Sequence, residues 1–298
     1  MISLRLWWRG SRRLVLLAAV VVAVTGVAGI ARAATLTCPA DMSVWQCASV
    51  GDVDPLGSLA TFIVAVAPLL LGLLLGVDAI GGEIDAGTAA LAWSIAPDRR
   101  RWLMGRIAPV LLATLAVALL SGAANTLIVA LLHPGHALPS SFVGYGLWGP
   151  IVVVRAITGY AVGLLLGVTL RRVVAAVALG VVAVAILLPL ALIVGRAFEP
   201  AVPFALGDPT TADALPVAAG MKGADGKPLQ GPCLVPNFPN DPTGQQQLAW
   251  QAANCIPWQT YVPGAQMPVV ELRESAVLVA AIVAAGGATF GLIASRRP

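Results

Sequence analysis

The chain has 298 residues, of which 58% are hydrophobic and 11% are charged, and its formal net charge is +4. Soluble domains carry about a quarter charged residues, so this composition argues against a water-soluble fold. The arginines stand at the ends of apolar runs, as in integral membrane proteins, and the positive net charge therefore does not indicate a nucleic-acid-binding protein.

Six apolar runs are long enough to cross a bilayer as helices, because the hydrocarbon core requires about 20 residues. In chain order they are residues 14–31, 56–77, 107–132, 147–170, 173–194 and 276–294. The fourth and fifth runs are separated only by Arg171 and Arg172. Two arginines at mid-membrane are costly, so the chain is expected to turn there. We predict an all-α integral membrane protein with six transmembrane helices.

The basic residues predict the orientation of these helices. With a cytosolic N-terminus, most of the 18 basic residues lie in short inner segments, where the positive-inside rule applies. They are Arg5, Arg9, Arg12, Arg13, Arg99, Arg100, Arg101, Arg106, Arg171, Arg172, Arg296 and Arg297. Both termini are therefore expected on the cytosolic side of the membrane.

The N-terminal segment has two interpretations. The basic start MISLRLWWRGSRR, the apolar run and Ala31-Arg32-Ala33 together have the form of a cleavable signal peptide. The run is longer than the usual apolar region of a signal peptide, and an arginine in the cleavage site is unfavourable. We therefore favour a retained first helix over cleavage within residues 1–33. Residues 4–13 fit either a short interfacial helix or a frayed tail.

Four cysteines fall in outer segments, Cys38 and Cys47 in the first and Cys233 and Cys255 in the last. All four are then on the side of the membrane where disulfides form and persist. Four cysteines permit three pairings, and proximity along the chain favours Cys38–Cys47 and Cys233–Cys255. Four unpaired buried thiols are the alternative, because free cysteine is commonly buried.

A long insertion precedes the last helix. Residues 196–274 are rich in proline and glycine and have poor apolar periodicity, so few and short helices are expected there. Both an ordered extracellular cap and a floppy external loop fit this composition. Residues 1–195 then carry the first five helices, and residues 275–298 carry the sixth helix and a cytosolic tail.

The motifs of common catalytic sites are missing from the sequence. It contains no H-E-x-x-H, no G-x-S-x-G and no G-x-x-x-x-G-K-[ST] motif. We therefore assign no catalytic residue and do not expect the chain to hydrolyse ATP. His133 and His136 lie in an HPGH turn, which offers too few ligands for a metal site, so no metal is predicted.

Two polar residues inside the apolar runs are candidates for a translocation path, Arg155 and Asn125. An intramembrane arginine either lines a water-filled cavity or has a structural role, in which it binds carbonyl groups or an acid on the outer side. Both interpretations stay open. Asn125 fits a helix–helix hydrogen bond of about 1 kcal/mol. GLLLG occurs at residues 72–76 and 163–167, and this small-xxx-small spacing favours close packing of helices within one subunit.

The segment EIDAGTAALAWSIAPDRRRW, residues 83–102, is a polar interruption between the second and third runs. We expect a helix over residues 83–97, with Glu83 and Asp85 near its start, where the helix dipole favours acids. Its mixed polar and apolar surface fits a docking site for a partner or an interfacial linker.

Four segments resemble a known family: APLLLGLLLGVDAIGGEIDAGTAALAWSIAPDRRRWLMGRI, LWWRGSRR, GYAVGLLLGVTLRRVVAAVALG and YVPGAQMPVVELRESAVLV. In the first, Glu83 precedes Gly87-Thr88, a Leu-Ala-Trp and an arginine run that ends at Trp102. The order of these segments resembles actinobacterial permease subunits of type-2 exporters in the ABC transporter superfamily. Asp78 and the long insertion depart from that pattern and put the substrate type in doubt.

The resemblance implies a function for the polar segment. In such exporters the first cytosolic loop is a coupling helix that contacts a separate ATPase, which here implies contacts by Glu83, Asp85, Gly87 and Thr88. Two permeases, as a homodimer or a heterodimer, work with two ATPases in the lipid bilayer. ATP and Mg²⁺ are bound by the ATPase, this chain binds no cofactor, and no nucleic acid is involved.

Two alternatives belong to other functional classes. A membrane sensor or immunity-type protein would bind a ligand through the insertion, within residues 197–274. An intramembrane enzyme is disfavoured, because the runs contain no paired catalytic groups.

Overall fold

The computed structural model describes residues 2–35, 55–88, 99–132, 137–142, 144–204, 213–223, 227, 250 and 253–295. The chain divides into two compact units. The first comprises residues 1–136, 144–195 and 271–298, and the second comprises residues 137–143 and 196–270.

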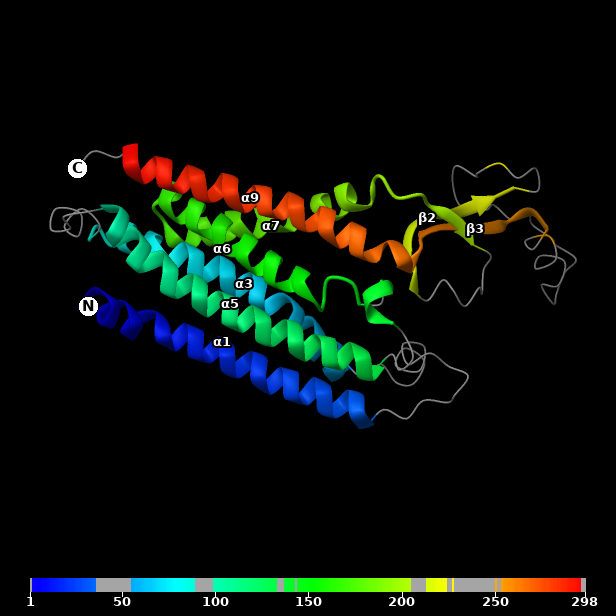
Figure 1. Ribbon diagram of the computed structural model, residues 1–298, viewed down its shortest axis with the longest axis horizontal. Helices are drawn as coiled ribbons and strands as arrows, with labels where there is room; N and C mark the ends of the chain where they lie inside the picture. Colours follow the sequence, from blue (N-terminus) through cyan, green and yellow to red (C-terminus); the bar gives the residue numbers. More distant parts are fainter. Residues whose placement is uncertain are drawn as a thin grey trace, which may run out of the picture. The chain divides into compact units, whose positions relative to one another are not determined.

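The first unit is a bundle of long helices that run alongside one another (Figure 1). They are α1 (Ile2–Thr35), α3 (Pro55–Asp85), α5 (Arg99–Leu132), α6 (Pro150–Leu170), α7 (Val173–Arg196) and α9 (Met267–Ser295). Within the described residues, these six helices are long and apolar enough to cross a membrane. This confirms the predicted all-α fold with six spans. The start of α1 and the end of α9 lie at the same end of the bundle (Figure 1).

The helix ends differ from the ends of the apolar runs. Helix α3 continues past the second run to Asp85, and α9 begins at Met267, well before the sixth run. Apolar length sets how much of a helix lies in hydrocarbon, whereas backbone hydrogen bonds continue outside it. The N-terminal residues are likewise part of the 34-residue helix α1 rather than a frayed tail or a separate short helix. The turn at the paired arginines is confirmed, because Arg171 ends α6 in the left-handed conformation (φ 56°).

Glycines bring α3 and α6 into backbone contact. A Cβ atom added to Gly72 or Gly76 of α3 would overlap the carbonyl oxygen of Ala156 or Tyr160, respectively. A Cβ atom added to Gly163 of α6 would overlap the carbonyl oxygen of Leu73. The two GLLLG motifs therefore lie in the contact between these two helices, which confirms the prediction that they pack helices within one subunit.

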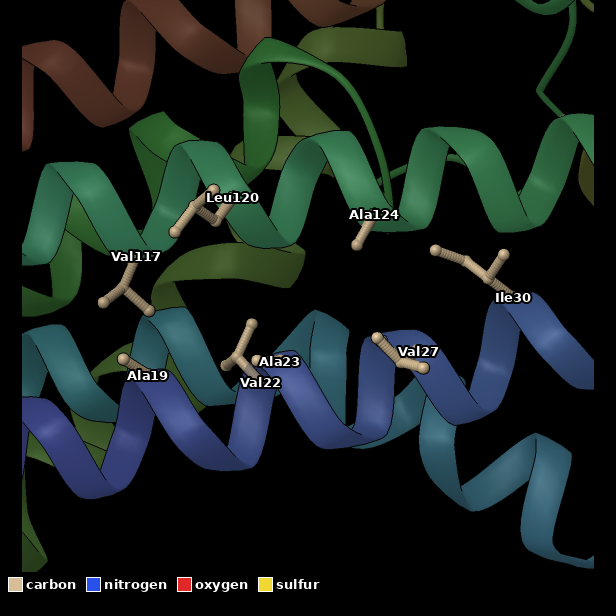
Figure 2. Close-up of a pocket in the computed structure, with 9 residues that line it drawn as sticks. Ala19, Val22, Ala23, Val27, Ile30, Val117, Leu120 and Ala124 are labelled. Carbon is tan, nitrogen blue, oxygen red and sulfur yellow. The ribbon is translucent and has the colours of Figure 1, made fainter.

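Helix α1 is part of the packed bundle. Its Val22 is buried in an apolar cluster with residues such as Leu75 of α3, Leu103 of α5 and Leu164 of α6. A cavity of ≈ 210 Å³ lies between α1 and α5 (Figure 2). Side chains such as Val22, Val27 and Leu120 line it, and Gly26 and Ala124 contribute small residues.

The second unit contains a small antiparallel sheet with the strand order β1-β3-β2. The strands are β1 (Val202–Phe204), β2 (Leu215–Lys222) and β3 (Ile256–Val262), and two short 3₁₀ helices accompany them, η1 (Leu138–Ser140) and η3 (Gly264–Gln266). Prolines within these strands hide their alternation in the sequence, and for this reason they were not predicted. The described residues of the insertion are therefore ordered, and their position in an extracellular cap stays a prediction.

Cys255 is buried and disulfide-bonded. Cys38, Cys47 and Cys233 lie outside the described residues, as do His133 and His136. The two predicted disulfide pairings therefore stay predictions.

Candidate functional site

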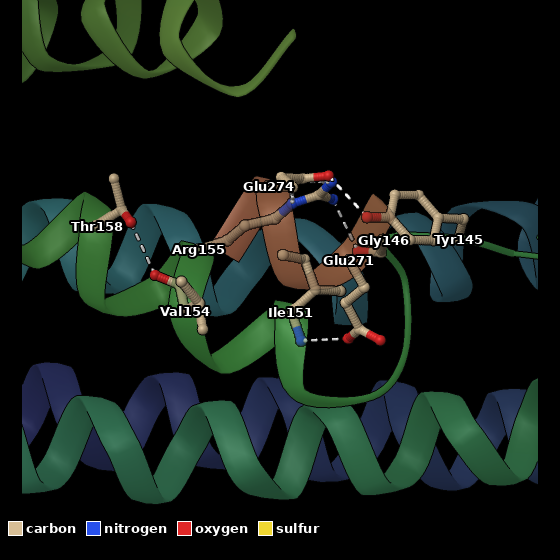
Figure 3. A network of polar contacts seen from close by, with 8 residues as sticks. All are labelled: Tyr145, Gly146, Ile151, Val154, Arg155, Thr158, Glu271 and Glu274. Carbon is tan, nitrogen blue, oxygen red and sulfur yellow. Dashed lines mark hydrogen bonds and ion pairs between the residues drawn. The ribbon is translucent and has the colours of Figure 1, made fainter. Parts of the chain in front are cut away.

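Arg155 and Glu274 form an ion pair between α6 and α9 (Figure 3). The Nε and Nη2 atoms of Arg155 donate to Oε1 of Glu274 at 3.0 and 2.7 Å. The Nη1 atom of Arg155 donates to the carbonyl oxygen of Gly146 at 3.0 Å. The Glu274 side chain has no exposed surface, whereas 19% of the Arg155 side chain is exposed. The guanidinium thus lies between a buried carboxylate and the edge of the bundle.

Tyr145 completes the coordination of the buried carboxylate. Its hydroxyl donates to Oε2 of Glu274 at 2.9 Å, so both carboxylate oxygens accept hydrogen bonds. Burial, and next the adjacent Glu274 carboxylate, raise the pKa of Tyr145 above its usual range. The hydroxyl therefore stays protonated and acts as a donor at neutral pH.

Glu271 accepts a hydrogen bond at the start of α6. Its Oε1 accepts a hydrogen bond from the backbone N–H of Ile151 at 3.2 Å. The first N–H groups of a helix have no partner inside that helix, and the residue before Pro150 is a glycine without a side chain to cap them. The cap of α6 is instead supplied by α9.

The turn formed by residues 144–149 is held from three helices. Besides its contacts to Arg155 of α6 and Glu274 of α9, it accepts a hydrogen bond from Nδ2 of Asn125 to the Leu147 carbonyl oxygen, at 2.7 Å. Asn125 is completely buried in α5. Its predicted helix–helix hydrogen bond is therefore corrected to a bond between a helix and this turn, because the turn has backbone carbonyls that the bundle must satisfy.

Sequence reasoning included Arg155 but missed Glu274, which binds it, and Glu271, which caps α6. Since the sixth helix was expected to begin at residue 276, Glu271 and Glu274 were assigned to the insertion. The signal that would have found them is the spacing of three residues between the two acids, directly before a long apolar run. The structure matches the interpretation in which Arg155 is tied to a carbonyl and an acid; its role in a translocation path is not tested by these contacts.

A second polar cluster lies at the opposite end of the bundle, where α3 ends and α5 begins (Figure 1). Nη2 of Arg106 is 2.5 Å from Oε1 of Glu83, and the guanidinium of Arg106 lies 5.9 Å from the centre of the Trp102 ring. Oδ2 of Asp85 accepts a hydrogen bond from the backbone N–H of Val173 at 3.4 Å. These contacts link the end of α3 to α5 and α7.

The prediction that a helix begins at Glu83 is wrong. Helix α3 continues to Asp85, and Gly87 follows in the left-handed conformation (φ 71°). The N–H and Oγ1 of Thr88 donate back to the Glu83 carbonyl oxygen at 3.0 and 3.2 Å, which is a C-terminal cap of the helix. Gly81 lies within α3 and packs against Gly167 of α6.

The acids therefore stand at the C-terminal end of α3, where the helix dipole is unfavourable for negative charge. Arg106 beside Glu83 and the first N–H of α7 beside Asp85 compensate for this position. Asp85, Gly87 and Thr88 are exposed, whereas Glu83 is half-buried. Residues 89–98, which make up most of the expected coupling helix, lie outside the described residues.

The arrangement defines the class of protein, a multi-pass helical membrane protein with polar clusters at both ends of its bundle. A family model described as ABC-2 membrane transporter related matches residues 12–194. This is more than half of the chain, which therefore belongs to that family and is an ABC-2 type permease, a membrane transport component that is not itself catalytic. No curated protein and no solved structure matches the chain.

Proposed function

We propose that this permease is the membrane-spanning subunit of an ATP-driven exporter and takes mechanical force from a separate ATPase. The observation that carries the proposal is the family match over residues 12–194, which spans the first five helices. The ATPase binds ATP and Mg²⁺, and this chain forms the translocation path together with a second permease copy, identical or related. Membership of a transporter family argues against the alternative that the chain is an intramembrane enzyme.

The orientation belongs to the same proposal. The end of the bundle with Glu83, Arg106 and Arg171 faces the cytosol of a bacterial cell, and both termini lie there. The positive-inside rule supports this assignment, as does the position of both chain ends at one end of the bundle (Figure 1). The packing of Val22 into the bundle supports retention of α1.

The contacts of the α3 end support different roles for the four coupling residues. Asp85, Gly87 and Thr88 are exposed and are available to an ATPase, whereas Glu83 is occupied by Arg106. A displacement of the segment after Gly87 would act on α3 directly. It would also act on α5 through Glu83–Arg106 and on α7 through Asp85 and Val173. In this proposal Gly87 and Thr88 receive force, Glu83 transmits it to α5, and Asp85 both receives it and transmits it to α7.

Purification from the native membrane tests the proposal. The full chain, solubilised in mild detergent, is expected to co-purify with an ATPase that carries the phosphate-loop motif, and the reconstituted complex is expected to hydrolyse ATP. A chain that purifies without such an ATPase, or whose presence does not alter the hydrolysis rate of the co-purified ATPase, would contradict the proposal. Ligand binding by the insertion without any ATPase would instead favour the sensor alternative.

We expect Thr88→Arg to weaken the association with the ATPase by about tenfold or more, because it places a long charged side chain on an exposed contact residue. The measurement is the apparent affinity of the detergent-solubilised permease for its ATPase. Thr35→Arg is the matched control. Thr35 is also exposed, but it is the last residue of α1 and lies at the end of the bundle away from Thr88. Equal affinities for the two variants would remove Thr88 from the contact.

We expect a cysteine at position 88 to be protected from a membrane-impermeant maleimide added to sealed cells, because this position faces the cytosol. Inside-out vesicles should expose the same Thr88→Cys thiol to the reagent. The measurement is the labelled fraction of the chain, corrected for the labelling of the parental chain. Labelling in intact cells would reverse the proposed orientation.

A further inference from the structure

The glycines of α9 differ from those of α3 and α6. At Gly72, Gly76 and Gly163 a Cβ atom would overlap the backbone of the facing helix, so the packing requires glycine. At Gly286, Gly287 and Gly291 of α9, a Cβ atom would meet nothing within 4 Å. Glycine inside a helix is less favourable than alanine, because it loses more backbone freedom on folding. Nothing in the described packing explains three such residues within six positions.

The contacts of α9 lie on both sides of these glycines. Toward the C-terminus, Ile293 is buried in the large apolar cluster of α3, α5 and α6. Before the glycines, Leu278 is fully buried beside Ile151 of α6 and Ala191 of α7. One turn and two turns further toward the N-terminus lie Glu274 and Glu271, respectively, with their polar contacts to α6 and to the turn before it. The glycines therefore separate the apolar contact of Ile293 from a segment that is attached by one apolar contact, at Leu278, and by the polar contacts of Glu274 and Glu271.

Polar attachment has a consequence for motion. Water can replace the hydrogen bonds of an ion pair when the two partners separate, and the Arg155 side chain already has exposed surface. Buried ion pairs contribute little net stability against their desolvation cost, and their best-attested use is to specify one arrangement or to act in a switch. Sharp bends in helices occur at prolines, at pairs of glycine or serine residues and at π-bulges, and Gly286 and Gly287 form such a pair.

We propose that residues 271–285 of α9 form a movable arm, which pivots at Gly286 and Gly287 and is latched to α6 by the contacts of Glu274 with Arg155 and Tyr145. The cap from Glu271 to Ile151 joins the start of α6 to the same arm. One part of this inference rests on the proposed exporter function. In that function the ATPase binds the end of the bundle with Glu83, and the arm opens the opposite end, from which substrate is released. Its existence as a latched, pivoting segment is testable without transport.

The probe is a thiol on the buried face of the arm, Leu278→Cys, and the reagent is a membrane-impermeant maleimide added to sealed cells that express the full chain. Leu278 has no exposed surface while the arm is latched, so slow labelling is expected. Glu274→Gln removes the negative charge and leaves the side chain nearly the same size. We expect it to raise the initial labelling rate about fivefold or more, which corresponds to losing roughly one hydrogen-bonded contact.

Adding Gly286→Ala, Gly287→Ala and Gly291→Ala to that variant is expected to return the rate toward the starting value. The three methyl groups have free space and stiffen the helix at the pivot. Gly105→Ala in α5 is the matched control, because a Cβ atom there also meets nothing within 4 Å. It should leave the raised rate unchanged. If Gly105→Ala lowers the labelling rate as much, the effect is a general stabilisation of helices, and the proposed pivot is wrong.

Tyr145→Phe guards against a Glu274→Gln chain that fails to fold, because it removes one hydrogen bond and keeps the ion pair. It should raise the labelling rate less than Glu274→Gln does. Unchanged rates in both variants, each eluting as a single species in detergent, would overturn the latch. None of these measurements needs an ATPase or a substrate, so their failure would leave the exporter proposal standing, and the absence of an ATPase partner would leave the arm standing.

Discussion

Replacing Gly163 with alanine is expected to destabilise the bundle by about 1–3 kcal/mol, the usual range for inserting a group into a filled core. The added methyl group would overlap the Leu73 carbonyl oxygen and lie 3.1 Å from the backbone N of Val77. Neither atom belongs to a flexible side chain, so α3 and α6 must separate to admit it. The check is the thermal unfolding midpoint of the purified chain in detergent, together with the yield of monodisperse protein.

Gly291→Ala is the control for this experiment. Alanine exceeds glycine in helix propensity by about 1 kcal/mol, and position 291 has space for the methyl group. Its midpoint should therefore stay constant or rise, while that of Gly163→Ala falls. If the two variants lose stability equally, glycine is required for some reason other than the α3–α6 contact.

The six helices could be predicted from the sequence because length and apolarity decide membrane insertion without reference to a partner. The turn at Arg171 and Arg172 follows from the same argument, since charges are excluded from hydrocarbon. The pairing of GLLLG with GLLLG is less direct. The small-xxx-small spacing predicts a close contact between helices. Only the three-dimensional packing shows that Gly163 lies against Leu73 rather than against another subunit.

The polar clusters required the structure because their partners are far apart in the sequence. Arg155 and Glu274 are separated by 119 residues, and periodicity around either residue contains no information about the other. Glu83 was placed at a helix start because acids favour that position. Tertiary contacts reversed this, since Arg106 and the start of α7 provide the positive potential that the end of α3 lacks.

The two polar clusters connect different sets of helices at the two ends of the bundle. At the end with Glu83, polar contacts connect α3 to α5 and α7. At the other end, polar contacts connect α6 to α9 and to the turn formed by residues 144–149. Between them, α3 and α6 are in backbone contact through their glycines. A closely packed α3–α6 pair is suited to carry a displacement from one end to the other, because backbone lies against backbone at these glycines and close-packed interiors transmit strain.

Reversing the charge of Arg155 is expected to have the largest effect in the bundle. Arg155→Glu would place a second carboxylate beside Glu274, whose side chain has no exposed surface, and would remove the donor to the Gly146 carbonyl oxygen. Breaking a buried ion pair costs about 3–5 kcal/mol, so little monodisperse protein is expected from detergent extraction. Combining Arg155→Glu with Glu274→Arg should recover part of that loss, because it restores opposite charges but leaves Tyr145 without its acceptor.

Arg155→Lys separates the structural role of this residue from a role in the translocation path. Lysine keeps the positive charge but cannot reproduce the fork in which Nε and Nη2 share Oε1 of Glu274 while Nη1 reaches Gly146. If Arg155 only ties α6 to α9, the folded fraction of Arg155→Lys and the ATP-driven efflux by its reconstituted complex should fall in proportion. A variant that folds normally but exports poorly would place the guanidinium in contact with the substrate, because a packing defect alone lowers both quantities together.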